Sequence, residues 1–343
     1  MYKIRPDFSR LKKVLLRDGE PDRVPFFDLY PSASFMETVV GKPAGSDTTV
    51  EFFYKMGYDY VYSEAGFNYN KLVNTTDSMT FVENNHGVIE NRKDFDAFPW
   101  RAVDSSVVTG ISIIEKLLPS GMKLNIDFSC GGVLEVVMAL MGYMPLSYAL
   151  YEDEQLIWDI FEKIGTDHIN ILKECFRNID HASIGVITMG EDMGFSHSTM
   201  LSPEHFRKFL FPWHKKIVEL VHNYDIPFVL HSCGKLDSIM DDLIDYVGID
   251  AKHSYEDKIL PVTEAKKKYG DRIAILGGVD IDFLCNACET GIREYVGNIL
   301  NICAPGGGYA LGTGNSIAGY IPVANYMIML DEGRKQGGYV KKL

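Results

Sequence analysis

Eight short β-rich runs, separated by helical patterns, constrain the fold of this chain more than any other feature. The runs are 24–30, 58–64, 123–129, 182–192, 227–234, 247–256, 272–280 and 308–316. Near-continuous apolar runs are typical of strands buried on both faces, as in parallel sheets. Eight alternating βα units predict an α/β fold, a (β/α)8 TIM barrel.

The helical patterns between the runs set the expected helices. Residues 145–177 have apolar positions at three- and four-residue spacing. Ser202-Pro203-Glu204 is a typical helix start, and that helix should reach about Tyr224 with a bend at Pro212. Another helix should begin at Asp280 and run to about Ile302, with a possible interruption at Gly291.

The long gap between the second and third runs predicts an insertion over about 66–122. Within it, two β-like runs flank Asn84-Asn85-His86-Gly87, so a hairpin is expected there. We therefore expect one domain over 1–343, with a hairpin or helical insertion between strands 2 and 3.

Charge and composition limit the partners. The chain has 343 residues and a formal net charge of −13. A field of that sign repels phosphate backbones and anionic lipid, which argues against nucleic-acid and membrane partners. No apolar run approaches the length of a membrane span. Six scattered cysteines do not form a disulfide framework, so we expect a cytoplasmic protein. The expected partner is a small-molecule substrate.

In such barrels the active site lies at the carboxyl ends of the strands. The runs predict that acidic, imidazole and thiol groups gather there, without arginine. The candidates for acid–base catalysis are Glu191, Asp192, His253 and Glu256. The candidates for substrate binding are Asp28, Tyr30, Asp127, Phe128 and Asn315.

The sharpest local signal is His231-Ser232-Cys233-Gly234. Residues i and i+2 of a strand point the same way, so His231 and Cys233 should project together. Imidazole nitrogen and thiolate sulfur are typical zinc ligands, although a Cys–His nucleophilic pair or simple core packing also fits. A zinc site needs a third ligand, and the candidates are Glu191, Asp192, His253, Glu256 and Cys130.

Across most of its length the chain resembles the uroporphyrinogen decarboxylase superfamily. The motifs that carry the resemblance are PDRVPFF, CGGVLEVVMALMGY, LYEDEQL, MGEDMGF, LSPEHFRKFLFPWHKKI, VLHSCGK, HSYED, ILGGVD, GGGYALGTGNSI and IPVANY. The resemblance implies a TIM barrel and one of two activities: decarboxylation of uroporphyrinogen, or methyl transfer to or from a corrinoid (cobalamin) protein.

Two departures from the superfamily pattern bear on the choice of activity: the first argues against the true decarboxylases, and the second weakens the assignment of a thiol substrate more than that of methyl transfer. The true decarboxylases carry arginines after the first strand, whereas this chain reads FFDLYPSASF. Thiol-directed methyltransferases hold zinc with His-x-Cys and a later cysteine; His231 and Cys233 match, but the later stretch reads GTGNSI. By the family's pattern the zinc site is incomplete: either Glu191, Asp192 or Glu256 completes it, or the protein works without zinc. The resemblance further implies a partner corrinoid protein and a thiol, methoxy compound or tetrahydrofolate as the other substrate. A uroporphyrinogen decarboxylase, a small-molecule decarboxylase and a non-catalytic binding protein are the alternatives.

Overall fold

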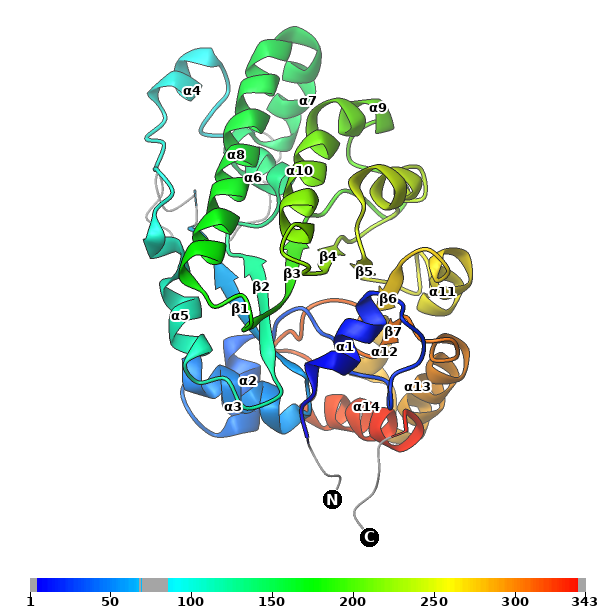
Figure 1. Ribbon diagram of the computed structural model, residues 1–343. Coiled ribbons are helices and arrows are strands. Elements are labelled where there is room, and N and C mark those ends of the chain that lie inside the picture. The colour runs from blue at the N-terminus through cyan, green and yellow to red at the C-terminus, as the bar shows by residue number, and fades with distance from the viewer. Residues whose placement is uncertain (1–4, 68, 70–85, 339–343) are drawn as a thin grey trace.

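A curved, all-parallel sheet forms the centre of the computed structural model, which describes residues 5–67, 69 and 86–338 (Figure 1). Its named strands are β1 (Tyr60–Ala65), β2 (Lys123–Phe128), β3 (Ile184–Gly190), β4 (Phe228–His231), β5 (Ala251–His253), β6 (Ala274–Leu276) and β7 (Tyr309–Ala310). They follow one another in sequence order, each parallel to the next. This arrangement confirms the barrel-like α/β fold expected from the repeated βα units.

The first predicted strand, 24–30, closes the barrel without forming a regular strand. Its one ladder contact within the described chain is a parallel bridge from Phe26 to Leu311. On the β1 side, the Tyr60 hydroxyl accepts from the Asp28 N–H (2.9 Å) and donates to the Asp28 carbonyl. A side chain thus takes the place of the main-chain partners that a strand would use.

Asp28 is the side chain that connects this first run to the last. The carboxylate is fully buried, and Oδ1 accepts from the Thr313 N–H at 2.7 Å and from the Thr313 hydroxyl. Oδ2 accepts from the Tyr58 hydroxyl. Burial raises the pKa of Asp28 to about 6 despite these donors. Asp28, proposed from sequence as a substrate-binding residue, therefore lies in the barrel wall.

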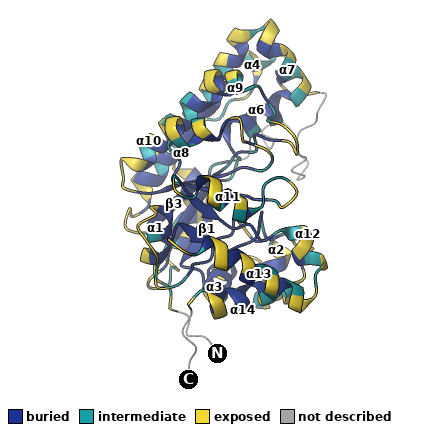
Figure 2. Ribbon diagram, turned by 90° about the vertical axis from the view of Figure 1, so that its right-hand side faces the viewer, coloured by how far each residue is buried: buried dark blue, intermediate teal, exposed yellow. Residues whose placement is uncertain are grey.

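Helices surround the sheet, and Figure 2 shows buried strands enclosed by helices with exposed outer faces. The helices before β3 are α1 (Phe8–Leu15), α2 (Ala33–Val40), α3 (Ser46–Met56), α4 (Arg92–Ala97), the 3-10 helix η2 (Ser105–Val108), α5 (Thr109–Glu115), α6 (Val133–Met141), α7 (Tyr143–Glu152) and α8 (Glu154–Asn178). Those after β3 are α9 (Pro203–His205), the π-helix η3 (Phe206–Leu210), α10 (Phe211–His222), the π-helix η4 (Asp242–Val247), α11 (Val262–Tyr269), α12 (Ile281–Asn286), α13 (Glu289–Cys303) and α14 (Val323–Gln336).

Three expected elements differ in detail. The helical pattern over 145–177 divides into α7 and α8 because the Asp153 carboxylate caps α8 at the Leu156 N–H (3.0 Å). The expected bend near Pro212 is a π-helical turn, η3, before α10. The helix from Asp280 is interrupted at 287–288, between α12 and α13, and not at Gly291.

The described part of the insertion between β1 and β2 contains helices and no strand. It contains α4, η2 and α5. The first run of the expected hairpin lies outside the described residues, and the second run, at 88–91, contains no strand.

No single helix in the described part of the chain is long and apolar enough to cross a membrane; α6 and α7 pass that test only together, bent by 96°. All six cysteines are free thiols.

We predict that Gly312→Ala destabilises the fold by about 2 kcal/mol or more. An added Cβ would lie 1.8 Å from the Phe27 carbonyl oxygen, where the first and last runs meet. Thermal unfolding followed by circular dichroism measures the effect. Gly110→Ala in α5 is the control, because a Cβ there meets nothing within 4 Å. Equal melting temperatures for the two variants would contradict this account of closure.

Candidate functional site

The strand register brings the predicted site residues to one edge of the sheet. Glu64 pairs with Asp127 across β1 and β2, and His231 pairs with Gly190 and His253 across β3, β4 and β5. Because all strands are parallel, their carboxyl ends meet at the same edge. Asp192 and Cys233 each lie two residues beyond their paired strand ends, so they are brought together as well.

A hydrogen-bonded pair of imidazoles fixes the orientation of His231. His253 Nε2 lies 3.1 Å from the Thr313 carbonyl oxygen, and the Nδ1 atoms of the two rings lie 2.8 Å apart. Burial lowers the pKa of His231 to about 3 and that of His253 well below its usual value, so both rings are neutral at pH 7.

These contacts assign the tautomers of both rings. A carbonyl oxygen only accepts, so His253 carries its proton on Nε2 and accepts at Nδ1. His231 must then donate from Nδ1, which leaves its Nε2 with a free lone pair. That atom lies 3.5 Å from Cys233 Sγ. His253, a candidate catalytic residue in the sequence, is therefore placed behind His231 as the group that orients it.

Asp192, His231 and Cys233 form a cluster with the dimensions of a metal site. Each offers one ligand atom, and these atoms all lie within 4.8 Å of one another. The Cys233 N–H donates to Asp192 Oδ1 at 2.8 Å, which turns the carboxylate toward the thiol. One carboxylate, one neutral imidazole and one thiol are the donor types that zinc takes in proteins. The residues present thus fit a zinc ion.

Two neutral groups also contact the Cys233 sulfur. The Asn315 amide Nδ2 donates to Cys233 Sγ at 3.3 Å, and the Ser254 hydroxyl lies 3.4 Å from it. Burial raises the pKa of the Cys233 thiol. Asn315, proposed as a substrate-binding residue, therefore lies against the cluster.

Glu191 points away from the cluster, as the alternation along a strand requires. It is fully buried and accepts from the Leu134 and Glu135 N–H groups, both at 3.0 Å, and from His214 Nε2 at 2.9 Å. A carboxylate at the start of α6 satisfies free N–H groups and favours the helix dipole. The structure places Glu191 in a supporting position beneath α6.

Glu135 is a site residue that the sequence reasoning missed. Its Oε1 accepts from the Asp192 N–H at 3.0 Å and its Oε2 from the Gly132 N–H at 3.3 Å. Burial, followed by the neighbouring Glu191 and Asp192 charges, raises its pKa to about 8. It was missed because the candidates were taken from the strand ends and Glu135 lies on α6, although an acid three residues after Gly131-Gly132 was a usable signal.

A second acidic group lies beside β1 and β2. The Tyr62 hydroxyl is 2.9 Å from Glu64 Oε1 and 3.2 Å from Asp127 Oδ2. Burial and the Glu64 charge raise the pKa of Asp127 to about 7. The Tyr30 ring lies 5.8 Å from that of Tyr62. Asp127 and Tyr30 therefore share one neighbourhood.

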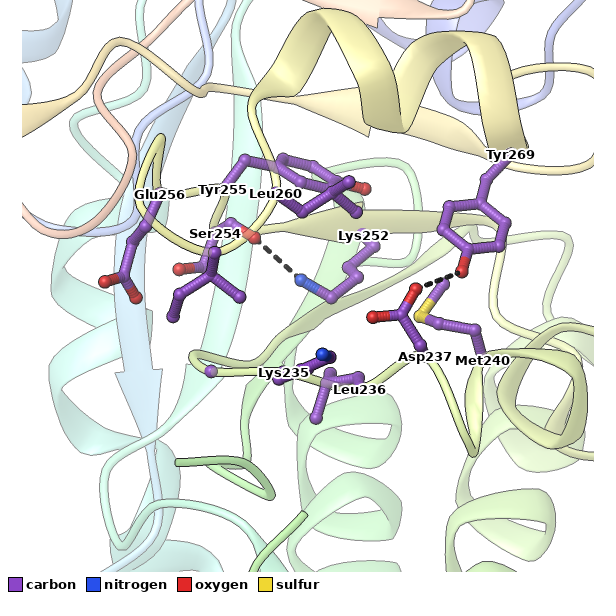
Figure 3. Close-up of a pocket in the computed structure, with 12 residues that line it drawn as sticks. Lys235, Leu236, Asp237, Met240, Lys252, Ser254, Tyr255, Glu256, Leu260 and Tyr269 are labelled. Carbon is purple, nitrogen blue, oxygen red and sulfur yellow. Dashed lines mark hydrogen bonds between the residues drawn. The ribbon is translucent and has the colours of Figure 1, made fainter. Parts of the chain in front are cut away.

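The remaining sequence candidates lie apart from the ligand cluster or at its border. Phe128 packs against the His168 ring at 4.8 Å, and Cys130 Sγ lies 3.7 Å from His168 Nε2, so this cysteine is not in the metal cluster. Glu256 is half-buried and lines a small pocket beside Ser254 (Figure 3).

Comparisons with known proteins agree with this architecture. The sequence model of the family described as "Uroporphyrinogen decarboxylase (URO-D)" matches residues 90–336. A "Methylcobamide:CoM methyltransferase MtaA" of Methanosarcina barkeri is 31% identical over 126 residues, 37% of this chain and 35% of the relative. The match thus spans about a third of the relative's length.

Two solved structures share the fold. A "methyltransferase from Methanosarcina mazei" superposes with a TM-score of 0.74 at 18% identity, covering 96% of this chain and 99% of the other. A putative vitamin-B12 independent methionine synthase from Listeria monocytogenes gives 0.52 at 10% identity, covering 92% and 96%.

We predict that the stability of the protein falls relative to Asp127→Asn as the pH rises through about 7. A pKa of about 7 in place of 3.8 means that ionising Asp127 costs the folded state up to about 4 kcal/mol. The stabilisation that the raised pKa gives is fully present below 3.8, the pKa of Asp127 in the unfolded chain. It is lost as the pH rises through about 7, the pKa in the folded protein. Asparagine keeps an acceptor for the Phe128 N–H and a partner for the Tyr62 hydroxyl.

Urea unfolding of both proteins at about pH 5 and about pH 8 measures the difference. Parallel pH dependence in the two proteins would contradict a buried, titrating Asp127.

Proposed function

The chain belongs to the uroporphyrinogen decarboxylase family, and within it we propose that this protein is a zinc-dependent methyltransferase that works with a corrinoid protein. The observation that carries the proposal is the cluster of Asp192, His231 and Cys233 at the strand ends, with ligand atoms within 4.8 Å. The named activities of the methyltransferases that resemble this chain support the same class. The methyl group would pass between the corrinoid and a thiol, a methoxy compound or tetrahydrofolate.

His231 would hold zinc through Nε2, Cys233 through Sγ and Asp192 through a carboxylate oxygen. A zinc ion there would act as a Lewis acid and lower the pKa of a bound thiol or hydroxyl. Cys233 must lose its proton to bind, so zinc affinity should rise with pH. His253 and the Thr313 carbonyl keep the His231 ring in the tautomer that presents a lone pair.

Half-buried acids around the cluster suit proton transfer to or from the second substrate. Glu135, with a pKa of about 8, is protonated at pH 7 and contacts the Asp192 N–H. A group with a pKa near the working pH is an effective acid or base. Glu256, beside Ser254, is the other half-buried acid near the cluster.

Uroporphyrinogen decarboxylation is less consistent with the site. That reaction would require Asp28 to face the substrate, but Asp28 is fully buried and both its oxygens accept hydrogen bonds within the barrel wall. Arginine is also absent from the stretch after the first run, and a polycarboxylate substrate needs such charges.

Zinc content tests the metal site directly. We expect about one zinc per chain, lost or greatly weakened in His231→Ala, Cys233→Ala and Asp192→Asn. Asparagine at this position keeps an oxygen acceptor for the Cys233 N–H and replaces the other carboxylate oxygen by an uncharged amide nitrogen. Cys130→Ala is the matched control, because its sulfur lies against His168. Zinc-free protein after loading, or full zinc in Asp192→Asn, would contradict the assigned ligand set.

Methyl transfer tests the activity. Zinc-loaded protein is incubated with methylcobalamin and, in separate reactions, a small thiol or tetrahydrofolate. In the reverse direction, a methoxy-aromatic compound is incubated with cob(I)alamin. We expect the cobalamin absorbance to change with one of these substrates, and at least about 100-fold more slowly with Cys233→Ala. No transfer with any of them, together with carboxyl loss from uroporphyrinogen, would reverse the choice between the two activities.

A further inference from the structure

A buried lysine lies immediately behind the ligand cluster. Lys252, on β5, is 4% exposed and points into the pocket that Leu236, Met240, Leu260 and Tyr269 help to line (Figure 3). Its ammonium Nζ donates to the carbonyl oxygens of Ser254 (2.7 Å), Ser232 (3.0 Å) and His253 (3.3 Å). An ammonium has three protons, and these carbonyls use all three.

The three carbonyls belong to the segments that carry the metal site. Ser232 lies between the ligands His231 and Cys233, at the end of β4. His253 orients the His231 ring, and Ser254 follows it at the end of β5. The Lys252 ammonium thus connects the carboxyl ends of β4 and β5 next to the metal cluster.

Ser254 has an unfavourable backbone conformation. Its φ is +81°, in the left-handed region that residues with a Cβ avoid. Such a conformation persists only where surrounding contacts enforce it, and these positions concentrate at functional sites. The shortest contact of Lys252 is to the carbonyl of this residue.

The conformation of Ser254 places its hydroxyl beside the metal-ligand sulfur. Its Oγ is 3.4 Å from Cys233 Sγ, and the Asn315 amide donates to the same sulfur at 3.3 Å. Groups that contact a ligand atom fix its position and orientation. The strained conformation of Ser254 therefore serves to hold its hydroxyl against the Cys233 sulfur.

We propose that Lys252 is a positioning residue for the metal site. Its ammonium holds Ser254 in the left-handed conformation, and this conformation keeps the Ser254 hydroxyl, beside the Asn315 amide, in contact with the Cys233 sulfur and so fixes the position of that sulfur. The link to metal binding rests on the proposed function, whereas the effect on the Cys233 sulfur does not require a metal.

Two substitutions and their combination test this chain of contacts. Lys252→Met removes the cation and keeps the length of the side chain, and Ser254→Gly removes both the hydroxyl and the strain. We expect Lys252→Met and Ser254→Gly each to weaken Co²⁺ binding about 10- to 100-fold and to change the thiolate-to-cobalt charge-transfer band. The double variant should bind no more weakly than Ser254→Gly, because Lys252 acts through Ser254.

Lys235→Met is the matched control. Lys235 lines the same pocket and is exposed, so this variant should bind Co²⁺ like the unmodified protein. Additive losses in the double variant, or Lys252→Met with unchanged binding and spectrum, would overturn the proposal.

Thermal unfolding covers the case in which Lys252→Met folds poorly. The loss in melting temperature caused by Lys252→Met should be smaller in the Ser254→Gly background, since glycine adopts a positive φ without strain. An equal loss in both backgrounds would overturn the proposed action on Ser254.

Alkylation of Cys233 separates this inference from the proposed function. In metal-free protein, Lys252→Met and Ser254→Gly should change the rate at which Cys233 reacts with iodoacetamide several-fold, because the sulfur loses the contact that fixes its position; peptide mass spectrometry follows the reaction. If the unmodified protein binds no metal but these variants change the alkylation rate, the metal proposal fails and the positioning role stands. Unchanged alkylation in both variants would contradict the positioning role whatever the metal result.

Discussion

The hydrogen bond between the Nδ1 atoms of His231 and His253 is the interaction on which the candidate site depends. It exists because β4 and β5 are in parallel register, with His231 opposite His253, and because Thr313 supplies a carbonyl to the far side of the second ring. Burial keeps both rings neutral. As a consequence, the His231 Nε2 lone pair already faces the cluster before any metal binds. The site is in this sense preorganised.

Three charged side chains are buried around this pair, and each of them has hydrogen-bond partners. Glu191 is satisfied by the start of α6 and His214, Asp28 by Thr313 and Tyr58, and Lys252 by three carbonyls. Each of these buried groups connects elements distant in sequence, so the strand ends are held in fixed positions around the site. The three candidate ligands, by contrast, retain atoms that face one another.

The regular parts of this arrangement could be predicted from the sequence. Apolar runs and helical spacing indicated the barrel, and the spacing of two between His231 and Cys233 placed both side chains on one face. The first run was not predictable in detail, because the Tyr60 hydroxyl takes the place of its main-chain partners. That substitution depends on the packing of two segments and leaves no local pattern.

The choice among third-ligand candidates depended on tertiary register. Asp192 and Cys233 are 41 positions apart and meet only through the β3–β4 pairing. Glu135 was missed because it belongs to a helix, and Lys252 because a lysine in a short strand normally indicates a surface position. Its burial and the positive φ of Ser254 are visible only in three dimensions.

X-ray absorption at the zinc edge of the loaded protein tests the central claim most directly, because it counts the ligand types around the metal. A centre made of Asp192, His231 and Cys233 predicts one sulfur at about 2.3 Å, with nitrogen and oxygen ligands at about 2.0–2.1 Å. A first shell with no sulfur, or with two sulfur atoms from the protein, would contradict it.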